Sequence, residues 1–176
     1  MEDYIYIHKL KNGDQNAASC LFEKYYDKIY YYCYRRVLNQ ETAQDLTQDT
    51  FIRVISSIDT YKDYGKFENY LYVIAGNLCK NYYKKMQSMP ILLEDVEITD
   101  IDDLTGKEDA IVVRQALEGL EEIEREIIIL RFYQELKIKD VARILGINLS
   151  TTKYHLKKGL DELRNILSED NKGGRA

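Results

Sequence analysis

The sequence predicts an all-α protein built from two helical modules that an acidic, flexible linker joins. The 176 residues include only nine glycines and one proline, which is unlike the turn-rich composition of a small β-sandwich. Apolar residues recur at three- and four-residue steps through most of the chain, as they do on one face of a helix. An uneven distribution of charge separates the two modules.

The net charge of −5 is concentrated in one short segment. Residues 1–86 contain 12 Lys and Arg against 11 Asp and Glu, and residues 110–176 contain the same numbers. Residues 87–109 contain one lysine against eight acidic residues, and they include the proline. No helical period continues through them, so they are expected to form the linker. Their charge would repel DNA phosphates, although a solvated loop without a further role is an equal alternative.

The first module, residues 1–86, is expected to be helical throughout. Residues 12–14 (NGD) predict a turn before a long amphipathic run, and Asn39 is placed to cap the next helix. A loop is expected over residues 59–66, before a last helix over residues 67–85. The residues expected to face the core are Leu21, Phe22, Tyr25, Ile29, Tyr32 and Cys33 in the first run, Ala43, Leu46, Thr47, Thr50, Phe51, Val54 and Ile58 in the second, and Leu71, Ile74, Ala75 and Leu78 in the third.

Polar residues are expected on the outer faces of the last two of these helices. The second helix places Asp45, Gln48, Asp49 and Ile52 there, and the third places Asn77, Lys80, Asn81, Lys84 and Lys85 beside Tyr82 and Tyr83. Tyrosines among lysines suit stacking on unpaired bases while the ammonium groups hold phosphates. An AT-rich genome would give the same excess of tyrosine, 16 in all, with no function attached.

The second module, residues 110–168, contains a helix-turn-helix pattern. Residues 136–145 and 149–167 predict two helices, and residues 146–148 (GIN) predict a tight turn between them. Ser150 is expected to cap the second helix. Residues 169–176 are expected to be a flexible tail. The core residues expected in this module are Leu117, Leu120, Ile123, Ile127, Ile128 and Leu130, then Val141, Ala142 and Leu145, then Leu156, Leu160, Leu163 and Leu167.

The start of the second helix of this pair is suited to reading DNA. Hydroxyl groups and free backbone N–H groups can meet phosphates, and lysines can reach guanine edges or the backbone. A plain amphipathic hairpin with a solvated basic face is the alternative. The residues expected at this surface are Ser150, Thr151, Lys153, Tyr154, His155, Lys157 and Lys158.

Other function classes find little support in the residues. Three cysteines and two histidines form no metal-ligand cluster, and neither GxGxxG nor GxxxxGK[ST] occurs. No catalytic residue, cofactor, metal or small-molecule substrate is therefore expected. The chain is expected to be cytoplasmic, because no apolar run approaches about 20 residues and residues 1–4 do not resemble the start of a signal peptide.

Several segments resemble motifs of bacterial RNA polymerase sigma factors. Residues 45–51 (DLTQDTF) are similar to DLTQEVF, and residues 67–77 (FENYLYVIAGN) are similar to F..WLy.IA.N. Residues 120–131 and 150–153 (STTK) resemble the LP...R.v..Lr and GTVksRl.RA patterns. Two modules with a short linker and no other domain resemble the small extracytoplasmic-function (ECF) group, over residues 14–168.

The resemblance implies a noncatalytic initiation factor that binds core RNA polymerase, recognises promoter DNA and promotes strand opening. Residues 1–86 would be the sigma-2 region and residues 110–168 the sigma-4 region. The implied partners are the β′ clamp helices, the β flap, promoter DNA and an anti-sigma factor. Asp45, Gln48, Asp49 and Ile52 would bind the clamp helices.

The resemblance also assigns the DNA contacts. A base flipped from the minus-ten element would lie near Tyr64, Phe67 and Asn77, with the strand backbone held by Lys80, Asn81, Lys84 and Lys85. The minus-thirty-five element would be read by Ser150, Thr151, Lys153, Tyr154, His155, Lys157 and Lys158. The family's tryptophan is Tyr70 here, its Leu-Pro is Leu120-Glu121, and an arginine is replaced by His155, which puts in doubt which bases are read but not the fold.

Two alternatives to this function remain open at the level of sequence. One is a free-standing helix-turn-helix regulator that binds duplex DNA as a dimer, with half-sites about one helical turn apart. The other is a nucleic-acid-processing enzyme in which Asp45 and Asp49, one helical turn apart, share Mg²⁺. The lack of further carboxylates on that face argues against the enzyme.

Overall fold

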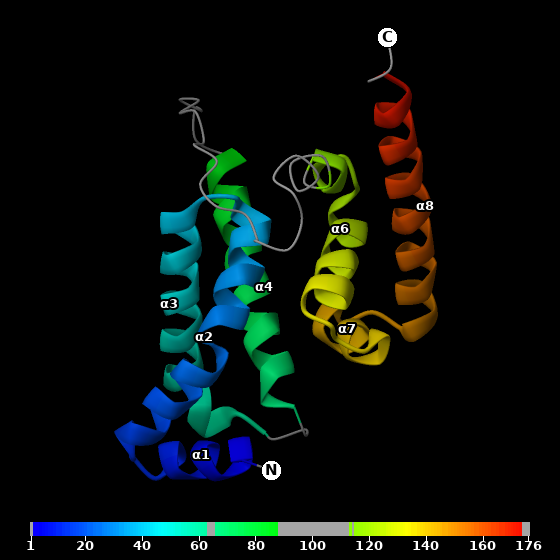
Figure 1. Cartoon of the computed structure of the whole chain (residues 1–176). Coiled ribbons are helices and arrows are strands. Elements are labelled where there is room, and N and C mark those ends of the chain that lie inside the picture. The colour runs from blue at the N-terminus through cyan, green and yellow to red at the C-terminus, as the bar shows by residue number, and fades with distance from the viewer. Residues whose placement is uncertain (1, 63–65, 88–112, 114, 174–176) are drawn as a thin grey trace. The chain divides into compact units, whose positions relative to one another are not determined.

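The computed structural model describes residues 2–62, 66–87, 113 and 115–173, which contain helices and no strand. The chain divides into two compact units, Met1–Asp95 and Val96–Ala176 (Figure 1). The prediction of an all-α protein with two helical modules is confirmed. Residues 88–109 of the expected linker lie outside the described residues.

The first unit is a helical bundle. It contains α1 (Glu2–Lys11), α2 (Gln15–Val37), α3 (Gln40–Ser57), the short 3₁₀ turn η1 (Ile58–Thr60) and α4 (Phe67–Gln87). The three long helices α2, α3 and α4 pack on one another, and α1 packs on α2 and η1. Figure 1 shows α1 crossing one end of the bundle.

Side-chain caps fix where α2 and α3 begin. The carboxylate of Asp14 accepts a 3.0 Å hydrogen bond from the N–H of Asn16, and Gly13 supplies the positive φ of +86° that the preceding turn requires. The side chain of Asn39 accepts a 2.8 Å hydrogen bond from the N–H of Thr42. The expected turn over residues 12–14 and the expected Asn39 cap are both confirmed.

The core of the bundle is rich in aromatic side chains. Tyr32 of α2 and Tyr72 of α4 are fully buried, with ring centroids 5.2 Å apart in an edge-on arrangement. Phe67 meets the rings of Tyr25 and Tyr61 edge-on at 5.9 and 5.6 Å. Edge-on aromatic pairs of this kind stabilise the fold beyond the contribution of the buried apolar surface.

The predicted core face of residues 43–58 is entirely buried, which confirms it. Two other expected core positions differ. Phe22 is 37% exposed and Ile74 is half-buried. Phe22 follows the buried Leu21 by one residue, about 100° around the helix, so its ring lies at the edge of the bundle against Phe51, 4.8 Å away.

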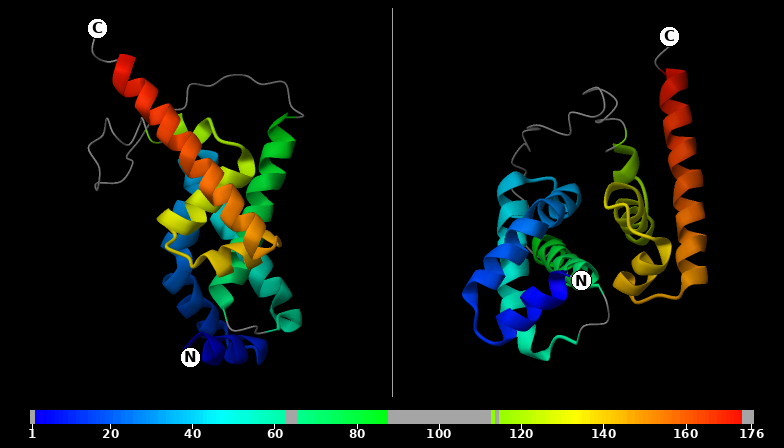
Figure 2. Two further views of the ribbon diagram at one scale, coloured as in Figure 1. Left: turned by 90° about the vertical axis from the view of Figure 1, so that its right-hand side faces the viewer. Right: turned by 60° about the horizontal axis from the view of Figure 1, so that its bottom comes forward.

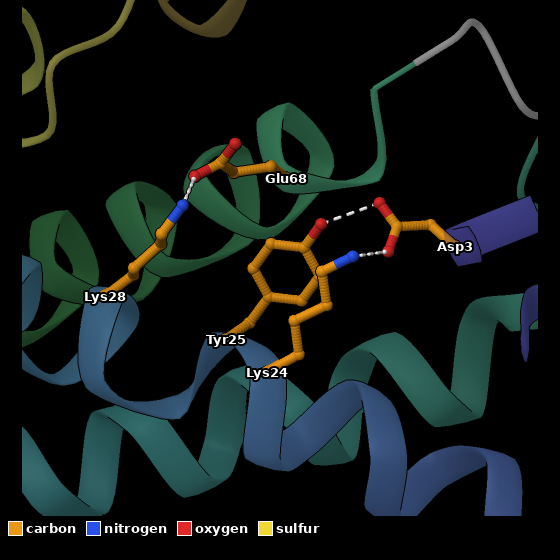
Figure 3. A network of polar contacts seen from close by, with 5 residues as sticks. All are labelled: Asp3, Lys24, Tyr25, Lys28 and Glu68. Atoms are coloured by element: carbon orange, nitrogen blue, oxygen red, sulfur yellow. Dashed lines mark hydrogen bonds and ion pairs between the residues drawn. The ribbon is translucent and has the colours of Figure 1, made fainter. Parts of the chain in front are cut away.

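A polar network connects α1 and α4 to α2 (Figure 3). Asp3 accepts hydrogen bonds from Lys24 (2.6 Å) and from the hydroxyl of Tyr25 (2.7 Å). Lys28 forms a 2.8 Å ion pair with Glu68. Partial burial would raise the pKa of the Asp3 carboxyl, but the hydrogen bonds from Lys24 and Tyr25 outweigh it and hold that pKa below its usual value.

The second unit contains the predicted helix-turn-helix. Its described elements are α6 (Glu122–Ile128), a π-helical turn η2 (Ile129–Tyr133), α7 (Ile138–Leu145) and α8 (Leu149–Gly173), and residues 115–118 are also helical. Helix α8 packs on both α6 and α7, and Figure 2 shows it as one long, continuous helix. Gly146, with a φ of +66°, ends α7 in the left-handed conformation that glycine favours.

Several details of this unit differ from the sequence prediction. The side chain that caps α8 is Asn148, which accepts a 2.8 Å hydrogen bond from the N–H of Thr151, rather than Ser150. The helix already begins at Leu149, so Ser150 lies inside its first turn. Leu160 is exposed rather than buried. Six other expected core residues of this unit are half-buried: Leu117, Ile123, Leu145, Leu156, Leu163 and Leu167. Helix α8 continues to Gly173, into the stretch expected to be a tail.

Candidate interaction surfaces

The outer face of α3 is an exposed surface with acidic and apolar character. Asp45, Gln48, Asp49 and Ile52 are all exposed, and the exposed fraction of Ile52 is 60%. The buried residues of α3 occupy the other side of the helix, so the 3.6-residue period brings these four together. Ile55, also exposed, follows Ile52 on α3. An apolar centre inside a polar rim is the anatomy of a protein-binding surface.

A row of aromatic rings lies on α2, the neighbour of α3. Phe22 lies 4.9 Å from Tyr26, and the rings of Tyr26, Tyr30 and Tyr34 stack at successive distances of 6.2 and 6.1 Å. Phe22 also touches Phe51 of α3. This row was not predicted as a unit, although its regular four-residue spacing is typical of one face of a helix.

The outer face of α4 is basic and rich in amides. Asn77, Lys80, Asn81, Lys84 and Lys85 are all exposed, whereas Tyr82 and Tyr83 are half-buried. The hydroxyl of Tyr83 donates to the carbonyl oxygen of Arg36 on α2, which holds this ring against the bundle. The lysines and amides are therefore the groups of α4 that a nucleic-acid strand can reach.

The residues expected to surround a flipped base are not brought together on one surface. Phe67 is only 2% exposed, because it is the first residue of α4 and its ring packs against Tyr25 and Tyr61 in the core. Asn77 is exposed further along α4, and Tyr64 lies outside the described residues. The ring of Phe67 is enclosed in the core and offers no open face to a base.

The start of α8 presents a basic, hydroxyl-bearing face. Ser150, Lys153, Tyr154 and Lys157 are exposed, with Tyr154 projecting furthest at 64% exposure. Thr151 is half-buried. These residues form the part of the predicted DNA-reading surface that is open to a ligand.

The side chains of His155 and Lys158, two of the residues predicted to face DNA, meet a carboxylate of α6. Glu124 is fully buried, and its Oε1 lies 2.8 Å from Nζ of Lys158 and 3.3 Å from Nδ1 of His155. Burial would raise the pKa of Glu124, but the hydrogen bonds from Lys158 and His155 outweigh it and lower that pKa. The same hydrogen bond to Glu124 raises the pKa of Lys158.

The described residues contain no group of three or more His, Cys, Asp or Glu side chains that could hold a metal ion. Among the helices of the same residues, none has the length and apolar character needed to cross a membrane.

Comparison with known proteins places both units in one family. The Sigma-70 region 2 family matches residues 21–88, and the Sigma-70 region 4 family matches residues 111–163. The ECF RNA polymerase sigma factor SigW of Bacillus subtilis is 32% identical to this chain, over 93% of this chain and 95% of its own length. The RNA polymerase sigma factor YlaC of the same organism is 28% identical, over 88% and 94%.

Two solved structures share the fold. The structure of CnrH in complex with the cytosolic domain of CnrY matches with a TM-score of 0.78 and 18% identity, over 97% of this chain and 99% of that one. The sigma factor RpoE in complex with the anti-sigma factor NepR, from Bartonella quintana, matches with a TM-score of 0.72 and 21% identity, over 85% and 96%. With both sigma-70 regions present in order and a relative of nearly equal length, the chain belongs to the ECF group of RNA polymerase sigma factors.

Proposed function

We propose that this sigma factor binds core RNA polymerase and promoter DNA through three surfaces defined above: the outer face of α3, the outer face of α4 and the start of α8. The observation that supports this most strongly is that both sigma-70 regions match, in order, on the two units that hold these surfaces. Residues 1–86 act as the sigma-2 region, residues 87–109 as the linker and residues 110–168 as the sigma-4 region.

The outer face of α3 is the surface for the β′ clamp helices. Asp45 and Asp49 lie one helical turn apart beside Ile52, so a partner can bury the apolar side chain while pairing cations with the two carboxylates. The exposed Ile55 enlarges the apolar centre. No other role within the bundle is visible for an isoleucine that is 60% exposed.

The outer face of α4 holds the minus-ten strand. Lys80 and Lys84 lie four residues apart on one face and are exposed, so both can contact the backbone of one strand. Unstacking a base costs a few kcal/mol, which contacts to the opened strand must offset. Asn77 and Asn81 lie on the same part of α4, and their side-chain amides can hydrogen-bond with base edges.

The start of α8 reads the minus-thirty-five element from the major groove, as the second helix of a helix-turn-helix does. Lys153, Tyr154 and Lys157 are its exposed contacts. The β flap of the polymerase is a further partner of this unit.

An anti-sigma factor is the proposed inhibitor of this chain. RpoE of Bartonella quintana, which has this fold, was solved in complex with the anti-sigma factor NepR. CnrH, which also has this fold, was solved in complex with the cytosolic domain of CnrY. The protein performs no catalysis of its own and acts in the cytoplasm, where core polymerase is found.

Reconstituted transcription tests the proposal. Transcript start sites are first mapped in cells after forced expression of the chain. On DNA that contains these sites, core polymerase with the purified chain is expected to start transcripts, and core polymerase alone is expected to start none. Asp45→Ala combined with Asp49→Ala is expected to weaken capture of core polymerase at least tenfold. Asp27→Ala, which removes an exposed carboxylate from α2, is the matched control and is expected to bind normally. Binding of the free chain to a DNA palindrome, with no effect on core polymerase, would show a free-standing regulator instead.

A further inference from the structure

A single buried carboxylate on α6 contacts two basic residues of α8. Glu124 is fully buried, and its Oε1 is shared by Lys158 at 2.8 Å and His155 at 3.3 Å. Its other oxygen, Oε2, makes no hydrogen bond among the described residues. A buried carboxylate costs free energy unless cations compensate it. The position of α8 is therefore coupled to Glu124 through charge.

Helices α6 and α8 approach each other closely at the same point. A Cβ added to Gly159 would lie 3.1 Å from Cβ of Glu124 and 3.0 Å from Cδ1 of Ile128, closer than ordinary van der Waals contact. Gly159 thus lets the two helices meet at the level of Glu124. Close packing sets the distance between the helices, and the contacts of Glu124 favour one rotation of α8 about its axis.

This rotation decides which basic residues of α8 are open to DNA. His155 and Gly159 lie on the side that faces α6. Lys158 meets Glu124 together with Glu121 (3.3 Å) and Glu162 (3.6 Å). Each residue advances about 100° around a helix, so the adjacent Lys157 points elsewhere and is exposed. A rotation of α8 that brought Lys157 to the position of Lys158 relative to DNA would move the ammonium group of Lys158 away from the buried carboxylate of Glu124.

We propose that Glu124 is a positioning residue for promoter recognition: by holding His155 and Lys158, it fixes the rotation of α8 so that Lys153, Tyr154 and Lys157 face the minus-thirty-five element. Lys158 serves this positioning and does not contact phosphate. The inference rests on the proposed role of α8 as the reader of that element.

The adjacent lysines provide a matched test in the holoenzyme. Promoter affinity is measured against salt concentration on a promoter found by start mapping. Removing a lysine that contacts phosphate flattens the slope of log K against log salt by about 0.9. Lys157→Ala is expected to flatten the slope by that amount. Lys158→Ala is expected to leave the slope unchanged, because the contact between His155 and Glu124 and the close packing at Gly159 still hold the rotation of α8. Equal flattening by both variants would show that Lys158 contacts phosphate and would overturn the inference.

Base preference supplies the second readout. Glu124→Gln keeps the shape of the side chain and removes its charge. On a promoter library randomised at both elements, its holoenzyme is expected to lose preference at the minus-thirty-five element at least fivefold and to keep the wild-type preference at the minus-ten element. Asp161→Asn, at an exposed position of α8, is the control and is expected to match the wild type. Unchanged minus-thirty-five preference in Glu124→Gln would overturn the inference.

The two proposals fail in distinguishable ways. If wild-type chain and core polymerase start no transcripts, the proposed function itself is wrong. If Glu124→Gln does not fold, which circular dichroism would show, the comparison of Lys157→Ala with Lys158→Ala still decides the inference, because Lys157 and Lys158 are both partly open to solvent.

Discussion

The hydroxyl of Tyr25 on α2 donates a 2.7 Å hydrogen bond to Oδ2 of Asp3 on α1 (Figure 3). The ring of Tyr25 also meets Phe67 of α4 edge-on. One buried side chain therefore links three helices of the first unit. The sigma-70 region 2 match begins at residue 21, so this bond attaches a helix that precedes the matched region to the bundle.

Tyr25→Phe is expected to lower the free energy of unfolding of the first unit by about 1 kcal/mol, because it removes one hydrogen bond and keeps the ring. Urea unfolding followed by near-ultraviolet circular dichroism measures it. All but two of the 16 tyrosines lie in this unit, so the signal reports on it. Tyr26→Phe, which removes a hydroxyl from a half-exposed ring, is the control. Equal stability of the two variants would contradict the prediction.

The acid dependence of this unit is expected to come partly from Asp3. Its pKa in the folded protein lies below its usual value, so folding favours the carboxylate. The resulting stabilisation is present above about pH 4 and is lost as the pH falls through the folded-state pKa. The stability difference between the wild type and Asp3→Asn is therefore expected to shrink between pH 6 and pH 2, measured by the same urea titration. A difference that is constant over this range would contradict the assignment.

The sequence allowed the helices of the first unit to be predicted because their apolar spacing matches a single helical period. Residues 43–58 show this well, since all seven expected core positions are buried. The prediction that Phe22 is buried was wrong. Periodicity cannot distinguish a core position from a position about 100° further around the helix, at the edge of the bundle. The exposed outer face of α3 was predictable because the same helical period defines its buried face. The spacing of residues does not show whether that outer face binds polymerase.

Lys158 and His155 show a different limit. Their spacing on α8 is compatible with a DNA-facing surface, and nothing local to α8 indicates otherwise. The partner that both side chains meet, Glu124, lies about 30 residues earlier on another helix. Such a contact depends on how α6 crosses α8, which the pattern of one helix does not encode. Phe67 is a similar case, since its burial depends on Tyr25 and Tyr61.

The corrected cap of α8 gives a stability prediction. Asn148→Ala is expected to destabilise the start of α8 by about 1 kcal/mol, because the N–H of Thr151 loses its acceptor. Ser150→Ala is expected to change the stability by less than about 0.5 kcal/mol, as for a surface substitution away from a cap. Hydrogen exchange of the amides in the first turn of α8 measures both. Faster exchange in Ser150→Ala than in Asn148→Ala would restore Ser150 as the cap.

The lysines of α4 give a prediction about strand opening. Lys80 and Lys84 are exposed, and neither lies in the core of the bundle, so their replacement by alanine is expected to leave the fold unchanged. If both hold phosphates of the opened strand, each substitution removes one charge contact, worth about 0.7 in the salt slope for a single strand. The double variant is expected to reduce the permanganate reactivity of thymines in the minus-ten element several-fold.

Lys9→Ala is the control for that measurement, because Lys9 is an exposed lysine on α1, away from α4. Capture of core polymerase by the double variant is expected to equal that of the wild type, since the proposed clamp-binding surface lies on α3. A loss of polymerase capture would place Lys80 and Lys84 in the polymerase interface instead. Normal thymine reactivity with normal capture would mean that the strand leaves the bundle by a different face, and the basic face of α4 would then serve only to keep the helix solvated.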